Sequence, residues 1–363
     1  MNYRVLCITD RSDLPETELF IGLKNAGVDI EVCCNPTGKH YQRLKKSGVP
    51  IIDLILHSRF DLAGIRRLSA QLKIKKYDIL YCFNNHAASN ALIVSKGMQC
   101  KIITYRGIIG NISLLSPASW TTHLNPRVNR VVCVCNAVRD FILSLRFLWF
   151  KVSPERIVTI YKGHDLCWYQ NDPVDLAEFN IPPDAFVVCF AGRNRPRKGI
   201  DVLIKSAQWL PANAPIHFLL LGKLTDDKKL RRLIEASPFR EKIHLPGFRN
   251  DAPAIAAACD AFILPSLERE GLARAVIEAM AYATPPIVTD VGGLPELVVD
   301  NESGFVVPPN DPKAIAGAIL ELLNNPSKKI LMGENARKRI QAKFHIRSTI
   351  AKTKQIFEEL VAS

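Results

Sequence analysis

A basic turn flanked by glycines lies near the middle of this 363-residue sequence. It is the stretch Ala191–Gly199, AGRNRPRKG, which follows a run typical of a buried strand and precedes a helical segment. The free N–H groups and the positive dipole end at the start of a helix favour an anion. Arg193 supplies a forked donor and Lys198 a compact charge, so with the backbone at Gly192 they could hold a diphosphate. The glycine spacing fits neither the dinucleotide fingerprint nor the P-loop, and a solvated basic turn without a ligand is the alternative.

Two glutamates, Glu270 and Glu278, form the second group, with seven residues between them. Gly271 lets the backbone approach a ligand, and a helix predicted at Leu272–Ala283 carries Glu278. The two carboxylates could act as an acid and a base, or could accept hydrogen bonds from sugar and ribose hydroxyls. The alternative is that Glu278 faces solvent, as helical glutamates most often do. A further glycine turn, Val291–Leu297, follows the next predicted strand and could be a second anion or ribose site.

The elements that must position these groups alternate between strand and helix along almost the whole chain. Seven strands are predicted in the first half, at Arg4–Thr9, Asp29–Cys34, Ile51–Leu56, Tyr77–Phe83, Lys101–Tyr105, Arg130–Cys135 and Arg156–Tyr161. The proline-rich segment Gln170–Pro183 then breaks regular structure. Five more strands are predicted after it, at Phe186–Ala191, Ile216–Leu221, Lys242–Leu245, Ala261–Leu264 and Pro286–Thr289. This alternation is typical of parallel sheets covered by helices on both faces.

We therefore predict an α/β protein of two tandem doubly wound, Rossmann-like domains, with a deep cleft between the carboxyl ends of their strands. The first domain would span residues 1–170 and the second residues 171–345. Three helices are predicted at the end of the chain, at Pro312–Leu323, Ser327–Lys343 and Ser348–Val361. The last of these, within residues 346–363, could cross back to brace the first domain.

Four ordered segments resemble the donor domain of the retaining glycosyltransferases of family four, which have the GT-B fold. They are AGRNRPRKG at 191–199, FILPSLEREGLARAVIEAMA at 262–281, PPIVTDVGGLPELV at 285–298 and GFVVPPNDP at 304–312. Together they cover the chain from about Phe186 to Leu323, and four motifs at the expected separations make the resemblance specific. It implies that the first domain binds an acceptor and the second a nucleotide-sugar donor.

The resemblance also implies roles for single residues. The positions that it marks for donor binding are Gly192, Arg193, Lys198, Glu270, Gly271, Leu272 and Glu278. Arg193 and Lys198 match the pair that neutralises the donor diphosphate. Glu278 matches the glutamate that holds the ribose hydroxyls, and Glu270 matches the one beside the transferred sugar. The backbone that follows Glu270 would lie near sugar hydroxyls or phosphate, so the expected catalytic residues are Glu270, Arg193 and Lys198.

The first half resembles the same family less closely. RVVCVCNAVRD at 130–140 and RIVTIYKGHD at 156–165 are similar to family segments, but the glycine pair usual after the first strand is absent from residues 10–16. Where many members have a histidine before a glycine, this chain has Arg106. Arg106 and His86 are therefore the expected acceptor-side residues, and a structural role for His86 is the alternative.

The reaction implied by the resemblance is transfer of a sugar with retention of its anomeric configuration, without a metal or another cofactor. The donor would be a UDP-sugar, or next a GDP-sugar, and the acceptor a glycan or a lipid-linked glycan in cell-surface polysaccharide or lipopolysaccharide synthesis. Another GT-B enzyme, such as a sugar epimerase or a phosphorylase, is the nearest alternative. A catalytically silent subunit that keeps the fold is a further one.

Positive charge is concentrated in the first half of the chain. Residues up to Gln170 contain 23 Lys+Arg and 12 Asp+Glu, which is +11 of the total +13, and the densest stretch is Lys39–Lys76. Such a field implies an anionic partner, for which we expect an anionic membrane surface or a lipid-linked acceptor. The segment Phe141–Lys151 adds aromatic and basic residues suited to the headgroup boundary, unless these aromatics pack under the neighbouring helix. A solvated basic face without a partner is the other alternative, and no recognisable motif supports nucleic-acid binding.

Several features of the sequence indicate the cellular compartment in which the protein is found. No apolar run approaches the roughly 20 residues that span a bilayer, and the N-terminus lacks the apolar core of a signal peptide. Most of the ten cysteines lie in or beside β-branched runs, where they are typical of small buried side chains in a reducing environment. Cys133 and Cys135 have the wrong spacing for a zinc knuckle. We therefore expect a cytoplasmic protein without a metal site, peripheral on the inner face of the membrane if it docks there.

Overall fold

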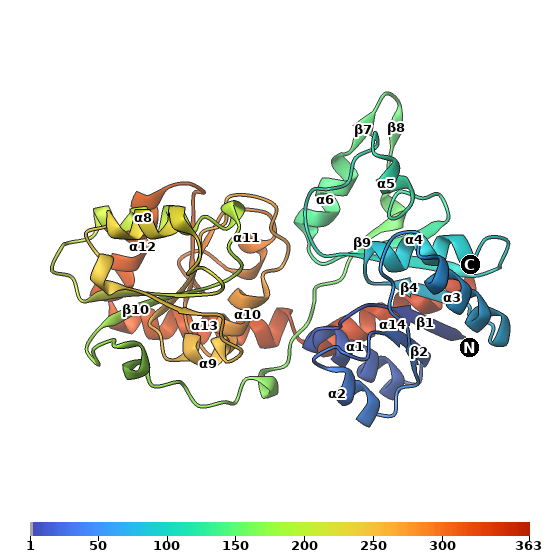
Figure 1. Ribbon diagram of the computed structural model, residues 1–363, viewed down its shortest axis with the longest axis horizontal. Helices are drawn as coiled ribbons and strands as arrows, with labels where there is room; N and C mark the ends of the chain where they lie inside the picture. The colour runs from blue at the N-terminus through green and yellow to red at the C-terminus, as the bar shows by residue number, and fades with distance from the viewer. Residues whose placement is uncertain (1–2) are drawn as a thin grey trace. The chain divides into compact units, whose positions relative to one another are not determined.

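The protein forms two compact units in the computed structural model, which describes residues 3–363 (Figure 1). The first unit comprises the described chain up to Gly163 together with Phe344–Ser363, and the second comprises His164–Lys343. These divisions lie a few residues before the predicted domain limits at 170 and 345. Both units are parallel α/β structures, so the predicted fold class is confirmed.

The close packing of Gly163 shows why the terminal helix α14 (Ile346–Ala362) belongs to the first unit. A Cβ atom at Gly163 would lie 2.6 Å from Cα of Ile346, so only glycine lets the two backbones approach. The helix then packs against α1 (Leu14–Asn25). Thr349 donates a hydrogen bond to the carbonyl oxygen of Tyr161, 2.8 Å away.

The first unit is built on a seven-stranded parallel sheet in the order β3-β2-β1-β4-β5-β6-β9. Its strands are β1 (Arg4–Ile8), β2 (Asp29–Cys34), β3 (Ile51–Asp53), β4 (Ile79–Cys82), β5 (Lys101–Arg106), β6 (Val128–Cys133) and β9 (Ile157–Thr159). Each predicted strand of the first half corresponds to one of these, although several are shorter than predicted. The order reverses between β1 and β4, as in a doubly wound sheet.

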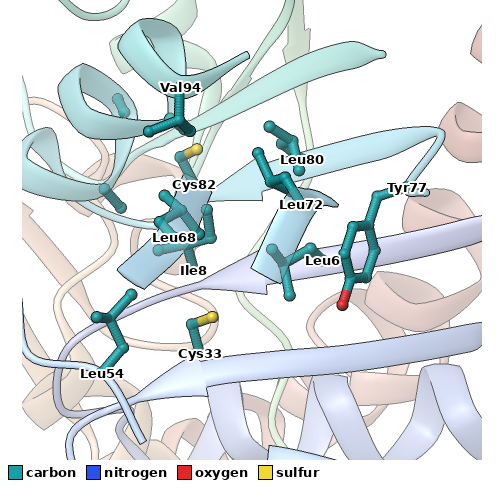
Figure 2. Packing of buried hydrophobic residues seen from close by; sticks show 13 residues of the cluster. Leu6, Ile8, Cys33, Leu54, Leu68, Leu72, Tyr77, Leu80, Cys82 and Val94 are labelled. Carbon is teal, nitrogen blue, oxygen red and sulfur yellow. The ribbon is translucent and has the colours of Figure 1, made fainter. Parts of the chain in front are cut away.

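Helices cover both faces of this sheet. One face carries α14, because Tyr81 of β4 points toward Phe357 of that helix, with ring centroids 5.9 Å apart. Helix α1 packs against α14, and α2 (Tyr41–Lys46) packs against α1, so both lie on the same face. The neighbouring residues Leu80 and Cys82 point the other way. They join a buried cluster with side chains of α3 (Leu62–Ile74) and α4 (Asn85–Val94), which Figure 2 shows from close by. The alternation of buried residues along β4 therefore fills two separate cores.

The helix α6 (Asn136–Ser144) lies on the same face as α3 and α4. The connections β3-α3-β4, β4-α4-β5 and β6-α6-β9 all advance across the sheet in one direction. Parallel crossovers are right-handed, so helices in connections that advance in the same direction cover the same face. The short helix α5 (Pro117–Trp120) precedes β6.

A small hairpin that the sequence analysis missed follows α6. Its strands are β7 (Arg146–Phe147) and β8 (Phe150–Lys151), which pair antiparallel around the turn Leu148-Trp149. Figure 1 shows it projecting from the first unit beside α6. Phe147, Leu148 and Trp149 are exposed, so these residues do not pack under the neighbouring helix.

The second unit is built on a six-stranded parallel sheet in the order β12-β11-β10-β13-β14-β15. Its strands are β10 (Phe186–Ala191), β11 (Ile216–Leu221), β12 (Ile243–Gly247), β13 (Ala261–Leu264), β14 (Pro286–Thr289) and β15 (Phe305–Val307). Its helices are α7 (Ile200–Ser206), α8 (Lys228–Glu235), α9 (Ala252–Ala257), α10 (Arg274–Ala281), α11 (Leu294–Leu297), α12 (Pro312–Asn324) and α13 (Pro326–Lys343). The strand order reverses between β10 and β13, where doubly wound sheets bind their ligands.

The predicted helix at Leu272–Ala283 was too long at both ends. Helix α10 begins at Arg274, because the preceding residue Ala273 has an extended backbone with ψ of 109°. It ends before Ala283, whose φ of +61° lies in the left-handed region that favours glycine.

Candidate functional site

Three loops of the second unit meet at one edge of its sheet. They leave the carboxyl ends of β10, β13 and β14, which are neighbouring parallel strands, and contain Arg193 and Lys198, Glu270, and Gly293 respectively. The first two loops lie on either side of the point at which the strand order reverses. The topology thus brings together the two groups that the sequence analysis identified separately.

The centre of this arrangement is the buried carboxylate of Glu270, which is 6% exposed. Its Oε1 atom lies 2.7 Å from Nζ of Lys198 and accepts a hydrogen bond from Ser266 Oγ at 2.8 Å. The guanidinium of Arg197 lies 3.9 Å from the same oxygen. One carboxylate oxygen therefore organises two cations from the β10 loop and a hydroxyl from the β13 loop.

Backbone contacts fix the two loops against each other. Leu267 donates its N–H to the carbonyl oxygen of Arg197 at 2.8 Å, and Nη1 of Arg197 donates to the carbonyl oxygen of Arg269 at 2.9 Å. Gly199, which caps α7, has φ of +65°, and a Cβ there would lie 1.9 Å from the carbonyl oxygen of Pro265. Only glycine can occupy this position without moving one of the loops.

The other donor-side candidates surround this pair. Arg193 is exposed, so its guanidinium faces solvent. Glu278, on α10, is half-buried and lies 3.3 Å from Nε of Arg274, one turn earlier on the helix. Gly271 is buried and Leu272 half-buried, in the loop between Glu270 and α10. This backbone has not yet entered the helix, so it keeps its polar groups available at the loop.

Two further contacts complete the loop after β14. The N–H of Gly293 donates to the carbonyl oxygen of Glu270 at 3.3 Å. The hydroxyl of Thr289, the last residue of β14, donates to the carbonyl oxygen of Ser266 at 2.6 Å. The sequence analysis missed Arg197 and Ser266, although both lie inside the motifs. The spacing of residues along the sequence does not show which side chains converge on Glu270.

The acceptor-side candidates lie in the first unit and already have partners. Nδ1 of His86 lies 3.1 Å from the carbonyl oxygen of Leu56. The guanidinium of Arg106 is buried, donates from Nε to the carbonyl oxygen of Ile108 at 2.9 Å, and donates from Nη2 to that of Gly110. Burial lowers the pKa of Arg106 below its usual range. Arg106 thus holds the loop after β5 in place, and a role in acceptor binding stays a prediction for both residues.

A polar group that the sequence analysis did not identify lies at the carboxyl end of β1. Glu16, on α1, accepts a hydrogen bond from the hydroxyl of Thr9, and Nζ of Lys162 lies 2.6 Å from Asp13 and 5.8 Å from the ring centre of Tyr105. A small cavity beside these groups, of about 20 Å³, has room for one water molecule. Desolvation raises the pKa of Glu16 to about 7. The sequence did contain an indication of this group, because residues 10–16 lack the glycine pair that is usual after the first strand and are mostly polar instead.

Among residues 3–363, no group of three or more histidine, cysteine, aspartate or glutamate side chains is arranged to hold a metal ion. No helix in the same range is both long enough and apolar enough to cross a membrane.

Each half of the chain matches the model of a known protein family. The family described as "Glycosyl transferases group 1" matches residues 172–339, and "Glycosyltransferase Family 4" matches residues 17–167. The chain belongs to glycosyltransferase family four. Its two sheets are those of the GT-B fold, and the site described above lies in the group 1 half of this glycosyltransferase.

Individual relatives agree with this assignment. The UDP-Gal:alpha-D-GlcNAc-diphosphoundecaprenol alpha-1,3-galactosyltransferase of Escherichia coli is 26% identical over 373 residues, which is 97% of this chain and 94% of that protein. The crystal structure of a glycosyltransferase from Rickettsia africae superposes with a TM-score of 0.82 at 20% identity and covers 99% of both chains. The crystal structure of Anabaena HepE in complex with UDP-glucose superposes with a TM-score of 0.78 at 20% identity and covers 98% of this chain and 100% of HepE. At such identities the two structures establish the fold.

Proposed function

We propose that this glycosyltransferase transfers a sugar from a UDP-sugar, with retention of anomeric configuration, to a lipid-linked or other glycan acceptor in cell-surface polysaccharide or lipopolysaccharide synthesis. The observation that supports this most directly is the ion pair between Lys198 and the buried Glu270, at the edge where the loops after β10, β13 and β14 meet. A GDP-sugar is the second candidate donor. The second unit would bind the donor and the first unit the acceptor.

Each donor-side residue has a proposed task. Lys198 and the exposed Arg193 neutralise the diphosphate, assisted by the backbone at Gly192. Glu270 accepts hydrogen bonds from hydroxyls of the transferred sugar, and the backbone of Gly271 and Leu272 contacts the same sugar or the phosphate. Glu278 accepts hydrogen bonds from the ribose hydroxyls. Nε of Arg274 lies 3.3 Å from Oε1 of Glu278 and orients this carboxylate.

The contacts of Glu270 suggest how the site prepares for its donor. Without a donor, Lys198 neutralises a carboxylate that would be costly to bury alone. An arriving diphosphate shares Lys198 with Glu270, while Ser266 Oγ still donates to the carboxylate. The ion pair therefore holds Lys198 in position before the donor arrives, which reduces the cost of ordering its long side chain.

The proposed chemistry is departure of the nucleoside diphosphate as the acceptor hydroxyl attacks from the same face of the sugar. The bond between the anomeric carbon and the diphosphate oxygen breaks, and the electron pair remains on the diphosphate. Lys198 and Arg193 stabilise the charge that develops there, an effect that commonly contributes a factor of about 100 to 1,000 in rate. The departing phosphate oxygen accepts the hydroxyl proton, so the new bond forms with retention and no enzyme nucleophile is needed.

The names of the relatives support the donor and acceptor classes. The Escherichia coli relative is named for UDP-galactose and for an acceptor on diphosphoundecaprenol, and HepE was crystallised with UDP-glucose. We propose that the present enzyme shares the UDP moiety and the lipid-linked class of acceptor.

The experiment that tests this proposal supplies candidate donors and acceptors to the purified enzyme. UDP-galactose, UDP-glucose and a GDP-sugar are incubated with and without N-acetylglucosamine on diphosphoundecaprenol, and the anomeric configuration of the product is determined by NMR. The expected result is a transfer product with the anomeric configuration of the donor. Conversion of donor alone to another nucleotide sugar would indicate an epimerase, and sugar phosphate formed with inorganic phosphate would indicate a phosphorylase. Either outcome, without transfer, would overturn the proposal.

A further inference from the structure

The positive charge of the first unit is confined to one part of the sequence. Residues 57–151 contain 14 Lys+Arg and 3 Asp+Glu, which is a net charge of +11. Residues 1–56 contain 7 of each and are neutral overall. Helix α14 adds three cations and two glutamates. The excess charge therefore belongs to residues 57–151, in which α3 and the two residues that follow it contain five cations, and not to α1, α2 or α14.

The structure corrects the expectation that Lys39–Lys76 acts as one basic cluster. Its cations divide between two faces of the sheet, because α2 lies with α1 on one face and α3 lies on the other. On the α2 side Arg43 forms an ion pair with Glu18, and the surrounding segment is balanced. Helix α3 has no acidic residue along Leu62–Ile74.

The exposed apolar side chains follow the same division. Where side chains are described, every exposed large apolar side chain of the first unit lies between Phe60 and Trp149, and none lies on α1, α2 or α14. On α3 itself Leu62 is 72% exposed and Ile74 is 75% exposed, beside the exposed cations Arg66 and Lys73. Cationic and apolar groups thus share one face of the first unit.

The tip of the hairpin is the most exposed apolar point on this face. Leu148 is 73% exposed and Trp149 is 89% exposed, and they form the two-residue turn between β7 and β8. Leu148 has φ of +53°, a conformation that usually selects glycine or asparagine in such turns and is unfavourable for leucine. Neither burial nor turn geometry accounts for an apolar pair here. A local mismatch of this kind indicates a functional surface.

Topology places the two ends of this surface at the same edge of the sheet. Helices α3 and α6 return antiparallel to the strands on the same face, so both end at the edge from which the strands begin. Ile74 is the last residue of α3, and the hairpin directly follows α6. Arg146 and Lys151 flank the tip in the hairpin strands. We call the exposed side of α3 and the hairpin tip the α3–hairpin face.

We infer that the α3–hairpin face docks the enzyme on an anionic lipid bilayer, with Leu148 and Trp149 inserted at the headgroup boundary. Aliphatic and aromatic side chains among cations suit this boundary, and each surface cation strengthens binding to anionic lipid by about fivefold. The cores of protein–protein interfaces are depleted in lysine, and surfaces that bind single-stranded nucleic acid typically use aromatic side chains on which successive bases stack. The inference deepens the proposed function, because a lipid-linked acceptor is presented at such a surface.

The test measures co-sedimentation of the full chain with vesicles, without donor or acceptor. Wild-type enzyme should bind vesicles of phosphatidylcholine that contain about 30% phosphatidylglycerol. It should dissociate from these vesicles as the NaCl concentration rises from about 0.05 M to about 0.5 M. It should bind pure phosphatidylcholine at least about tenfold more weakly. Absence of binding to the anionic vesicles at low salt would overturn the inference and leave the donor experiments unaffected.

Matched variants locate the surface. R66E/K73E on α3 should weaken binding by about 30-fold or more, whereas R347E/K352E, the same charge change on α14, should change it by about twofold or less. Leu148→Ser/Trp149→Ser should also weaken binding and remove quenching of tryptophan fluorescence by brominated lipid. Ile330→Ser/Leu331→Ser on α13 removes a comparable exposed apolar pair and should preserve both. Equal losses in test and control variants would overturn the assignment to this face.

One further outcome identifies a different occupant. If sedimentation equilibrium shows a dimer that Leu148→Ser/Trp149→Ser dissociates, a second copy of the chain covers the tip and the bilayer assignment is wrong. Circular dichroism and thermal unfolding verify that each variant is folded. The α3 and hairpin substitutions change exposed side chains, so we expect their unfolding temperatures to match the wild type within about 2 °C.

Discussion

The side chains of the proposed donor site differ in how firmly the structure holds them. Lys198 and Arg193 have the same predicted partner, the diphosphate, but their surroundings in the structure differ. Lys198 neutralises the buried Glu270 at 2.7 Å, whereas Arg193 is exposed to solvent. The two substitutions that remove these cations should therefore have the same effect on catalysis and different effects on stability.

Arg193→Ala should reduce turnover by about 100-fold or more, because it removes a cation that stabilises the departing diphosphate, and should leave the unfolding temperature unchanged. Lys198→Ala should reduce turnover similarly and also destabilise the second unit by about 3 kcal/mol, because it leaves the buried carboxylate of Glu270 with weaker compensation. Steady-state kinetics and urea unfolding measure the two effects. Arg195→Ala, an exposed cation of the same loop, is the control for both. Full activity in either of the first two variants would remove that residue from the site.

Glu278→Gln tests the proposed contact with the ribose. The variant should weaken binding of the UDP-sugar by about 1–3 kcal/mol, which is the usual contribution of a hydrogen bond to a charged group. A 2′-deoxyribose donor lacks one of the hydroxyls concerned, so wild type and variant should differ less with this donor. Calorimetric titration of the four combinations measures the difference. Equal loss with both donors would place Glu278 away from the ribose.

At the scale of elements, the sequence predicted most strands of both sheets, because parallel strands buried on both faces appear as continuous apolar runs. β15 and the β7–β8 hairpin were missed. β15 has only three residues, and the hairpin has two-residue strands around a turn without the usual glycine or asparagine. The motif residues were predicted individually. Their convergence on Glu270 was not, because Lys198 and Ser266 belong to different loops that only the strand order brings together.

The turn after α10 offers a test of backbone strain. Ala283 has φ of +61°, which is unfavourable for a residue with a Cβ atom. Ala283→Gly should stabilise the second unit by about 0.5–1 kcal/mol, after allowance for the greater freedom of glycine in the unfolded chain. Urea unfolding at equilibrium measures this gain. A loss of stability would show that the methyl group of Ala283 contributes packing that outweighs the strain.

At the scale of the whole molecule, the stability of the first unit should depend on pH through His123. This side chain is buried between Thr104 Oγ1 at 3.0 Å and Asn85 Oδ1 at 3.1 Å. Desolvation lowers its pKa to about 3, so the folded state keeps the ring neutral where the unfolded chain binds a proton. Because the unfolded state then binds more protons, the stability contributed by neutral His123 is lost as the pH falls below the unfolded pKa of about 6.5.

The expected size of this effect is about 2 kcal/mol between about pH 7 and about pH 5. Urea unfolding of wild type and His123→Gln at these two values measures it. On acidification, the free energy of unfolding of the variant should fall by about 2 kcal/mol less than that of the wild type, whatever the stability of the variant at neutral pH. Identical pH dependence in the two proteins would show that His123 is not held neutral in the folded state.

The central claim is that the second unit binds the diphosphate of a UDP donor through Lys198 beside Glu270. The most direct test is calorimetric titration of UDP into wild type, Lys198→Ala and the control Arg195→Ala, with GDP as the comparison nucleotide. We predict that UDP binds the wild type more tightly than GDP does. Lys198→Ala should weaken UDP binding by about 10- to 100-fold, and Arg195→Ala should change it by about twofold or less. Failure of UDP to bind the wild type, or equal UDP affinity in wild type and Lys198→Ala, would contradict the claim.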